Sequence, residues 1–168
     1  MEFENVIRNR CSIRSFQSKQ VEEEKLNKIL EAGNLAPSAK NLQPLKIIVI
    51  ESEKYLEKIR EASPCTYNAQ TVLLVCASKE EAFNKGDFST YEMDASIATT
   101  HMMLEATNLG VDSVWVELFD ADKIKESFPL EEGYSPICLL PLGYRTEDAE
   151  ISPNHYKRKK LEEIVSRI

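Results

Sequence analysis

The pattern of hydrophobic and polar positions predicts a chain in which helices and buried strands follow one another. Four runs are almost wholly apolar, which is typical of strands buried on both faces; they are Leu45–Ile50, Thr71–Ala77, Ser113–Val116 and Ile137–Leu142. Other segments have the apolar spacing or the flanking signals of helices; they are Phe3–Arg10, Val21–Asn34, Ser52–Ala62, Tyr91–Gly110 and Ala121–Phe128. The pattern therefore predicts a single helix-rich α+β domain over residues 1–168, without an internal repeat or a linker.

The longest predicted helix is apolar or small nearly all round. Between Met93 and Leu109 the large side chains do not keep to one stripe, and alanine and threonine occupy the remaining positions. Such a helix is usually buried on every side. In a chain of 168 residues this burial is more easily arranged if a second subunit covers one face, so we expect an obligate dimer. The alternative is a central helix of a monomeric core.

Composition and charge exclude several classes of function. The formal net charge of −7 argues against a nucleic-acid binder, which usually carries a basic face. No run approaches the roughly 18 apolar residues of a membrane-spanning helix, and the first residues lack the features of a signal peptide, so we expect a cytoplasmic protein without a membrane partner. Four scattered cysteines, with no CxxC pair and no histidine at ligand spacing, predict no metal site.

Common catalytic and phosphate-binding motifs are absent from the sequence. The five glycines do not form a GxGxxG or P-loop pattern, and there is no GxSxG elbow. Of the two histidines, His101 lies in the buried helix and is expected to be structural, whereas His155 lies in a basic tail and could be a surface residue. A cofactor with its own reactivity, which the protein binds and orients, remains the best interpretation.

Two short motifs offer groups that suit such a cofactor. Arg10-Cys11-Ser12-Ile13-Arg14 combines guanidinium groups with a hydroxyl, the donors that a phosphate needs. Ala36-Pro37-Ser38-Ala39-Lys40-Asn41-Leu42-Gln43-Pro44 is a proline-stiffened loop with polar groups at Ser38 and Asn41. Alone, the first motif could be a solvated basic turn and the second an ordinary loop.

Two further motifs follow in the second half of the chain. One is Leu104–Val116, with Leu109-Gly110 at the end of the long helix and Trp115-Val116 in the next strand. The other is Leu142-Gly143-Tyr144, followed by the tail Lys157-Arg158-Lys159-Lys160-Leu161-Glu162-Glu163-Ile164-Val165. Taken in this order, from Val6 to Val165, the four motifs resemble the nitroreductase-like FMN-dependent flavoprotein family.

This resemblance implies a fold and a shared site. The fold is a central, mainly antiparallel sheet flanked by helices, in an intertwined homodimer with two FMN sites at the subunit interface. One subunit would hold the phosphate, the ribityl chain and the pyrimidine edge, through Arg10, Ser12, Arg14 and Arg158 of its tail. The other subunit would approach the same flavin with Pro37, Ser38 and Asn41. The basic run around Arg158 could otherwise be a solvated charge run or a nucleic-acid patch.

The resemblance also implies an activity. NADH or NADPH would deliver hydride to flavin N5 and leave, and a small acceptor such as a nitroaromatic or a quinone would then take the electrons. No catalytic acid or base is expected from the protein. Two alternatives stay open: a related flavoenzyme that carries out reductive dehalogenation or oxidative flavin cleavage, and a non-catalytic flavin-binding or regulatory protein.

Four features depart from the family pattern. Cys11 and Ala39 replace residues that often contribute a polar contact, and Glu117 puts a carboxylate where glycine is frequent. The stretch from Tyr67 to Tyr91 is short compared with larger members, which cover the flavin with extra helices. We therefore expect an open site whose local chemistry depends on these residues.

Overall fold

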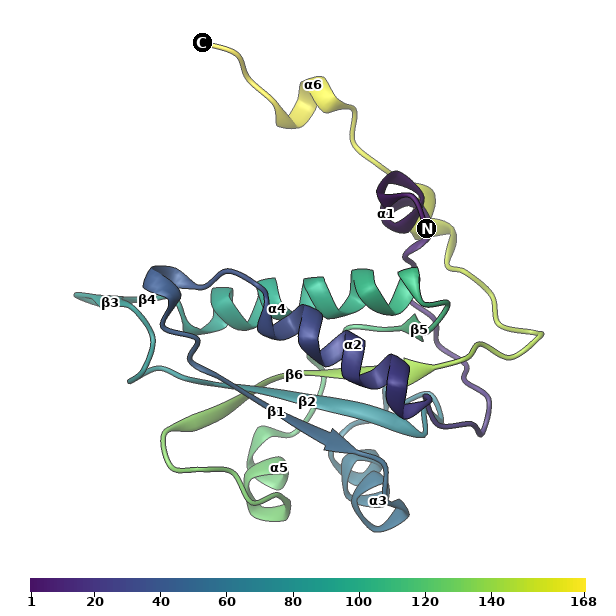
Figure 1. Ribbon diagram of the computed structural model, residues 1–168, viewed down its shortest axis with the longest axis horizontal. Helices are drawn as coiled ribbons and strands as arrows, with labels where there is room; N and C mark the ends of the chain where they lie inside the picture. Colours follow the sequence, from purple (N-terminus) through teal and green to yellow (C-terminus); the bar gives the residue numbers. More distant parts are fainter.

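A four-stranded antiparallel sheet forms the centre of the protein (Figure 1). The computed structural model describes residues 1–168. The strands lie in the order β1 (Leu45–Ile50), β2 (Thr71–Ser78), β6 (Tyr134–Gly143) and β5 (Asp112–Ser113). In register, Leu45 of β1 faces Ala77 of β2, and Thr71 of β2 faces Leu142 of β6. All eight residues of β2 are buried, because helices cover both faces of the sheet.

Helices form one layer on each face of the sheet (Figure 1). The layer on the upper side consists of α2 (Glu23–Asn34) and α4 (Tyr91–Asn108), and the layer on the lower side of α3 (Glu53–Ala62) and α5 (Ala121–Ser127). The remaining elements lie around these layers: α1 (Phe3–Asn9), the 3₁₀ turns η1 (Ala39–Asn41) and η2 (Pro153–Tyr156), the hairpin β3 (Asn84–Lys85) and β4 (Phe88–Ser89), and α6 (Leu161–Ile164). No helix is both long and apolar enough to cross a membrane.

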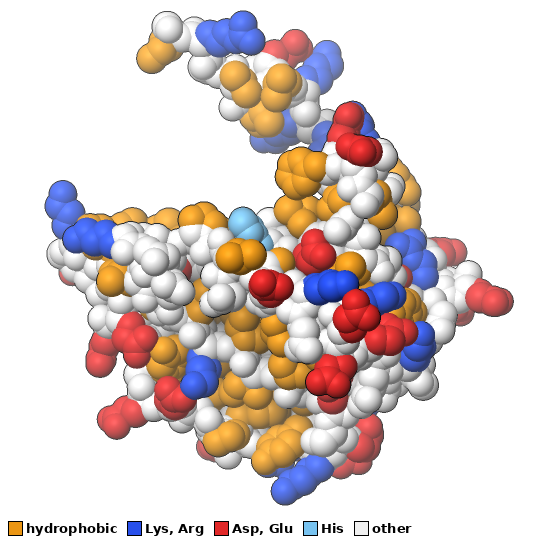
Figure 2. Space-filling model, in the orientation of Figure 1, with side chains coloured by type: hydrophobic (Ala, Val, Ile, Leu, Met, Phe, Trp, Pro, Cys, Tyr) orange, Lys and Arg blue, Asp and Glu red, His pale blue; other side chains and the backbone are white.

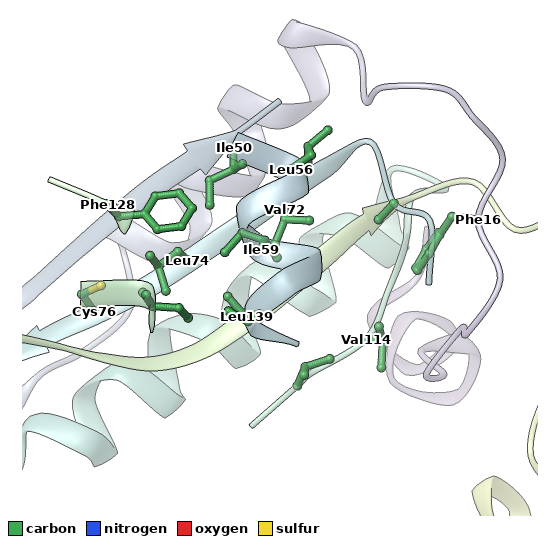
Figure 3. Close-up of a cluster of buried hydrophobic side chains, with 14 of the residues drawn as sticks. Phe16, Ile50, Leu56, Ile59, Val72, Leu74, Cys76, Val114, Phe128 and Leu139 are labelled. Atoms are coloured by element: carbon green, nitrogen blue, oxygen red, sulfur yellow. The ribbon is translucent and has the colours of Figure 1, made fainter. Parts of the chain in front are cut away.

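Strand alternation divides the core into two clusters. In β2, Val72, Leu74 and Cys76 point down towards α3 and α5. Figure 3 shows Leu74 close to Phe128 and Val72 close to Ile59. Their neighbours in β2, Leu73 and Val75, point up towards α2 and α4. Burial raises the pKa of the Cys76 thiol to about 12, so this cysteine behaves as a small apolar side chain.

The strand predicted at Ser113–Val116 is wrong in its extent, because β5 ends at Ser113. Val114 donates its backbone N–H to Pro141 at 3.2 Å, but proline has no N–H to return. The ladder is therefore interrupted, and Val116 rejoins β6 only through an isolated bridge to Leu139. The other three strands and the predicted helices are present, with ends shifted by at most three residues; the largest shift is at the start of β6, which begins at Tyr134 and not at Ile137.

Within one chain, α4 is covered on one side only. Ala95, Ala98, Met102 and Ala106 are buried against α2 and the sheet, whereas Met93 and Ile97 are 47% and 37% exposed. Figure 2 shows hydrophobic side chains along this upper edge of the body. In the single chain one side of α4 is thus left exposed, and the alternative of a helix wholly buried in a monomeric core is not observed. The predicted dimer, which would cover the exposed side, stays a prediction.

Candidate functional site

A polar pocket of about 200 Å³ lies between the segment that follows α1 and the C-terminal tail. Four of the predicted cofactor residues line it: Arg10, Ser12, Arg14 and Arg158. No hydrophobic side chain contributes to its wall. The fold thus brings together the basic motifs from the two ends of the sequence.

Three further residues of the pocket were missed by sequence reasoning. Ser152, Asn154 and His155 come from η2 and its first flanking residue. The Ser152 hydroxyl accepts the Asn154 backbone N–H at 3.3 Å, and the Ser152 carbonyl accepts that of His155 at 2.8 Å. The sequence Ser-Pro-Asn could have predicted this turn, because a capping serine followed by proline is typical of the start of a helical turn. The turn places His155 in the wall of the pocket and not on an extended tail.

From Cys11 to Arg14 the chain presents its residues alternately to the core and to solvent, and Phe16 then returns to the core. Cys11, Ile13 and Phe16 are buried, whereas Arg14 is exposed and Ser12 is half-buried. The backbone follows the edge of the sheet, since Ser12 pairs with Ser113 and Ile13 donates to Ser113 O at 3.1 Å. Because side chains alternate along an extended chain, the same backbone that buries Ile13 turns Ser12 and Arg14 to the pocket.

An ion pair fixes the end of β6 to β5 beside this segment. Asp112 accepts from the Arg145 backbone N–H at 2.9 Å and from Nε of its guanidinium at 3.0 Å. Arg145 Nη2 lies 3.7 Å from Cys11 Sγ, and the hydrogen bond to Asp112 is the main cause of the raised pKa of Arg145. Cys11 thus faces Arg145 and the core, not the pocket.

Arg14 lies next to a second small polar cluster. Tyr67 has a pKa above its ordinary value, chiefly because of its hydrogen bond with Cys65 and its partial burial, while Arg14 acts in the opposite direction. Glu117, by contrast, accepts the Trp115 indole N–H at 3.0 Å and does not line the pocket. The guanidinium of Arg14 therefore meets a phenol and no carboxylate at this edge.

The loop Ala36–Pro44 is built by its own hydrogen bonds. Ser38 accepts twice, through its hydroxyl from Gln43 N–H and through its carbonyl from Asn41 N–H, both at 2.9 Å. Three non-glycine residues have left-handed backbones: Lys40 (φ 53°), Asn41 (φ 57°) and Gln43 (φ 50°). Pro37 and Asn41 are exposed at its surface, so the loop presents polar groups to a ligand from a rigid frame.

A buried carboxylate attaches this loop to the first turn of α4. Asp94, 2% exposed, accepts the Ala39 backbone N–H at 3.0 Å and the Thr90 hydroxyl at 2.8 Å. The pocket lies beyond the other end of the same helix, beside Ser113. Between Asp94 and Asn108 the helix rises roughly 21 Å, at about 1.5 Å per residue, and Figure 1 shows the two regions at opposite ends of α4. One chain therefore does not bring Pro37, Ser38 and Asn41 to the pocket.

The charge of the pocket favours an anion. Three guanidinium groups and one imidazole line it, and no carboxylate does, although the whole chain has a net charge of −7. Guanidinium groups bind planar oxyanions with paired hydrogen bonds. A phosphate group fits this set of donors.

Comparison with known proteins gives the family. A family model described as the nitroreductase family matches residues 7–66 and 62–144. A relative from Methanothermobacter thermautotrophicus is 32% identical over 88% of this chain and 80% of its own length; its proposed assignment is NADH dehydrogenase/NAD(P)H nitroreductase. This chain belongs to the nitroreductase family. An Archaeoglobus fulgidus relative with the same proposed assignment is 30% identical over 92% of this chain and 96% of its own length.

Solved structures place the nitroreductase fold over the whole chain. The crystal structure of a nitroreductase family protein from Clostridium difficile has a TM-score of 0.91 and 38% sequence identity. It covers 99% of this chain and 98% of its own. The predictions of the family, of an antiparallel sheet flanked by helices and of an oxidoreductase are confirmed.

Proposed function

We propose that this nitroreductase binds FMN and oxidises NADH or NADPH, with a small molecule such as a nitroaromatic or a quinone as electron acceptor. The observation that carries the proposal is the pocket beside α1, where three arginines and a serine meet without a carboxylate. The assignments of the archaeal relatives as NAD(P)H nitroreductases support the same cosubstrate.

The donors of the pocket match the parts of FMN. Arg10, Arg158 and the Ser12 hydroxyl suit the terminal phosphate, to which guanidinium groups make charge-assisted hydrogen bonds. Arg14 is free of a carboxylate partner in the structure, so its charge is available to stabilise negative charge at the pyrimidine edge. When bound, FMN supplies the two-electron chemistry between the nicotinamide and the acceptor.

The complete site requires two copies of the chain. The loop that presents Ser38 and Asn41 is roughly 21 Å along α4 from the pocket of its own chain, so it can serve only the pocket of another. An antiparallel pairing of α4 with its copy brings the start of one helix to the end of the other. The exposed residues Met93 and Ile97 supply the apolar surface for this contact.

The C-terminal tail supports an intertwined arrangement. Leu161 and Ile164 of α6 are 71% and 65% exposed, and Figure 1 shows α6 standing away from the body of the chain. An amphipathic turn with apolar side chains in water gains free energy when a partner covers it. We propose that the second subunit covers the apolar side chains of α6. Arg158 lies where the tail leaves the pocket.

The cofactor assignment is tested by FMN titration and by reduction. Purified protein should quench FMN fluorescence on binding, and the visible flavin band should bleach on addition of NADH or NADPH. Arg10→Ala or Arg14→Ala should weaken FMN binding roughly ten- to hundredfold, the loss of one charge-assisted bond of about 1.5–3 kcal/mol. Lys19→Ala is the matched control, since Lys19 pairs with Glu22 outside the pocket.

Three outcomes would contradict parts of this proposal. Equal FMN affinity in Arg10→Ala, Arg14→Ala and Lys19→Ala would reject the pocket as the phosphate site. Tight FMN binding without bleaching by either nucleotide would favour the non-catalytic flavin-binding protein. A flavin that is reduced but transfers no electrons to nitroaromatics or quinones would favour the related flavoenzymes.

A complementation experiment tests the shared site. An Arg10→Ala/Arg14→Ala chain damages one half of the site, and a Ser38→Ala/Asn41→Ala chain damages the other. Mixed dimers of the two should regain one undamaged site, so that a statistical mixture has about one quarter of the native sites. If both halves lay in one chain, every chain in the mixture would carry damage and no native affinity would return.

A further inference from the structure

His155 is the only histidine among the residues that line the phosphate pocket. Its neighbours there are Arg10 and Arg14 from the segment after α1 and Arg158 from the tail, together with the uncharged Ser152 and Asn154. The edge of the imidazole also meets the ring of Tyr156, with centroids 5.0 Å apart at 79°. No carboxylate lines the wall to balance a fourth positive charge.

The charge of this imidazole depends on what the pocket holds. A phosphate dianion attracts an imidazolium and accepts its N–H. Histidine is the side chain whose charge changes between about pH 5 and 8, so the balance falls in the physiological range.

We propose that His155 is a further ligand of the FMN phosphate, and that FMN binding is coupled to proton uptake by its imidazole. The inference rests on the proposed FMN site. Because the complex holds the extra proton, affinity is greatest where the imidazole is charged and falls as pH rises and the proton is lost. A tail residue of this protein thus makes cofactor retention sensitive to pH near neutrality.

The position of His155 in the wall distinguishes it from the other histidine. His101 lies in α4, beside Leu104 and Phe3 in a separate groove of about 340 Å³. The chain has only these two histidines. His101→Gln therefore removes the same chemical group from another site. Because His101 lies midway along α4, where the proposed dimer axis passes, the variant serves as the control once sedimentation shows that it has the same oligomeric state as wild type. The N-terminal amine donates to Asn108 at 2.8 Å and is unchanged in every variant.

The experiment measures FMN dissociation constants by fluorescence quenching at pH 6.5 and pH 8.5. Wild type should bind about fivefold more weakly at the higher pH, which corresponds to the difference of roughly 1 kcal/mol between a charge-assisted and a neutral hydrogen bond. His155→Gln should lack this weakening and bind FMN about as weakly as wild type does at pH 8.5. His155→Lys, which keeps its charge, should bind tightly at both pH values. Ionisation of the phosphate itself, with a second pKa near 6, acts equally on all variants and in the opposite direction.

Riboflavin provides the second arm, because it lacks the phosphate. Its binding should show no difference between wild type and His155→Gln. The same fivefold change in His155→Gln as in wild type, or its loss in His101→Gln, would overturn the role of His155. Absence of FMN binding by wild type at both pH values would instead overturn the proposed cofactor, and with it this inference.

Discussion

Replacing Asp94 by alanine should release the loop Ala36–Pro44 and weaken FMN binding at the far side of the dimer. The Asp94 carboxylate is 2% exposed and accepts from Ala39 N at 3.0 Å and from the Thr90 hydroxyl at 2.8 Å. A hydrogen bond to a charged group contributes about 1.5–3 kcal/mol. Thr90 retains only a long contact of 3.5 Å to the Phe83 carbonyl, so little of this free energy is recovered.

The backbone of the loop makes it sensitive to this loss. Lys40 and Gln43 have φ values of 53° and 50°, and a left-handed conformation costs a non-glycine residue about 1–2 kcal/mol. The strain of these two residues is thus similar to the free energy that Asp94 contributes. Without the carboxylate, we expect the native loop conformation to fall to about a tenth of the population, which weakens apparent FMN affinity about tenfold.

The assay combines urea unfolding with FMN titration. Asp94→Ala should lower the free energy of unfolding by about 2 kcal/mol, equivalent to a fall in melting temperature of roughly 4–8 °C for a domain of this size. Asp94→Asn is the matched control: its amide oxygen can still accept from Ala39, and its NH₂ can donate to the Thr90 hydroxyl, so it should lose less of both. Reduced stability with unchanged FMN affinity in Asp94→Ala would refute the reasoning, since the carboxylate would then support the core and not the loop.

Three further predictions concern the frame around the site. Asp112→Asn and Arg145→Gln should each lower the free energy of unfolding by about 1–2 kcal/mol, and the double variant should lose less than their sum, because the two side chains act as one pair; additive losses in urea unfolding would contradict the pairing. Gly33→Ala would place a Cβ 2.8 Å from Met102 Cγ, where Met102 is fully buried, and should cost about 1–3 kcal/mol; an unchanged melting temperature would show that Met102 moves aside freely. Hydrogen bonds from Lys19 and Tyr144 lower the pKa of Glu22 to about 2, so its contribution to stability is present above about pH 4.5 and is lost as the pH falls towards 2; Glu22→Gln should show a smaller loss of stability over this interval, and an identical acid profile would refute the assignment.

The fold was predictable where burial is continuous along the chain. β2 is buried at every position, and its apolar run alone indicates a buried strand. β1 is equally apolar in sequence, but it is an edge strand in which only Ile50 is buried, so its burial was overestimated. The end of β5 depends on Pro141 in another strand, some 28 positions away from Ser113 in sequence, which no local pattern reveals. The hairpin β3–β4 was missed because its two-residue strands are mostly exposed and polar.

The sequence predicted the kinds of side chain in the candidate site better than their positions in space. Arg10, Ser12 and Arg14 stand at alternate positions and line one pocket with Arg158, and their role as cofactor ligands stays a prediction. His155 was missed because its position depends on the turn η2, whose residues carry no hydrophobic period. The Ser38 hydroxyl already accepts the Gln43 N–H within the loop, which leaves its proton and one lone pair for a ligand.

The separation of the two half-sites along α4 also constrains the proposed dimer. In a twofold arrangement each residue of α4 faces a residue equally far beyond the axis, so the Asp94 end meets the Asn108 end only if the axis crosses near the middle of the helix. The exposed apolar residues Met93 and Ile97, together with the groove lined by Leu104 and Phe3, extend on both sides of His101. The exposed apolar surface of α4 is therefore centred near His101, which is also where the twofold axis must cross to complete the proposed FMN site. One arrangement of the two subunits would both bury this apolar surface and bring the two halves of each FMN site together.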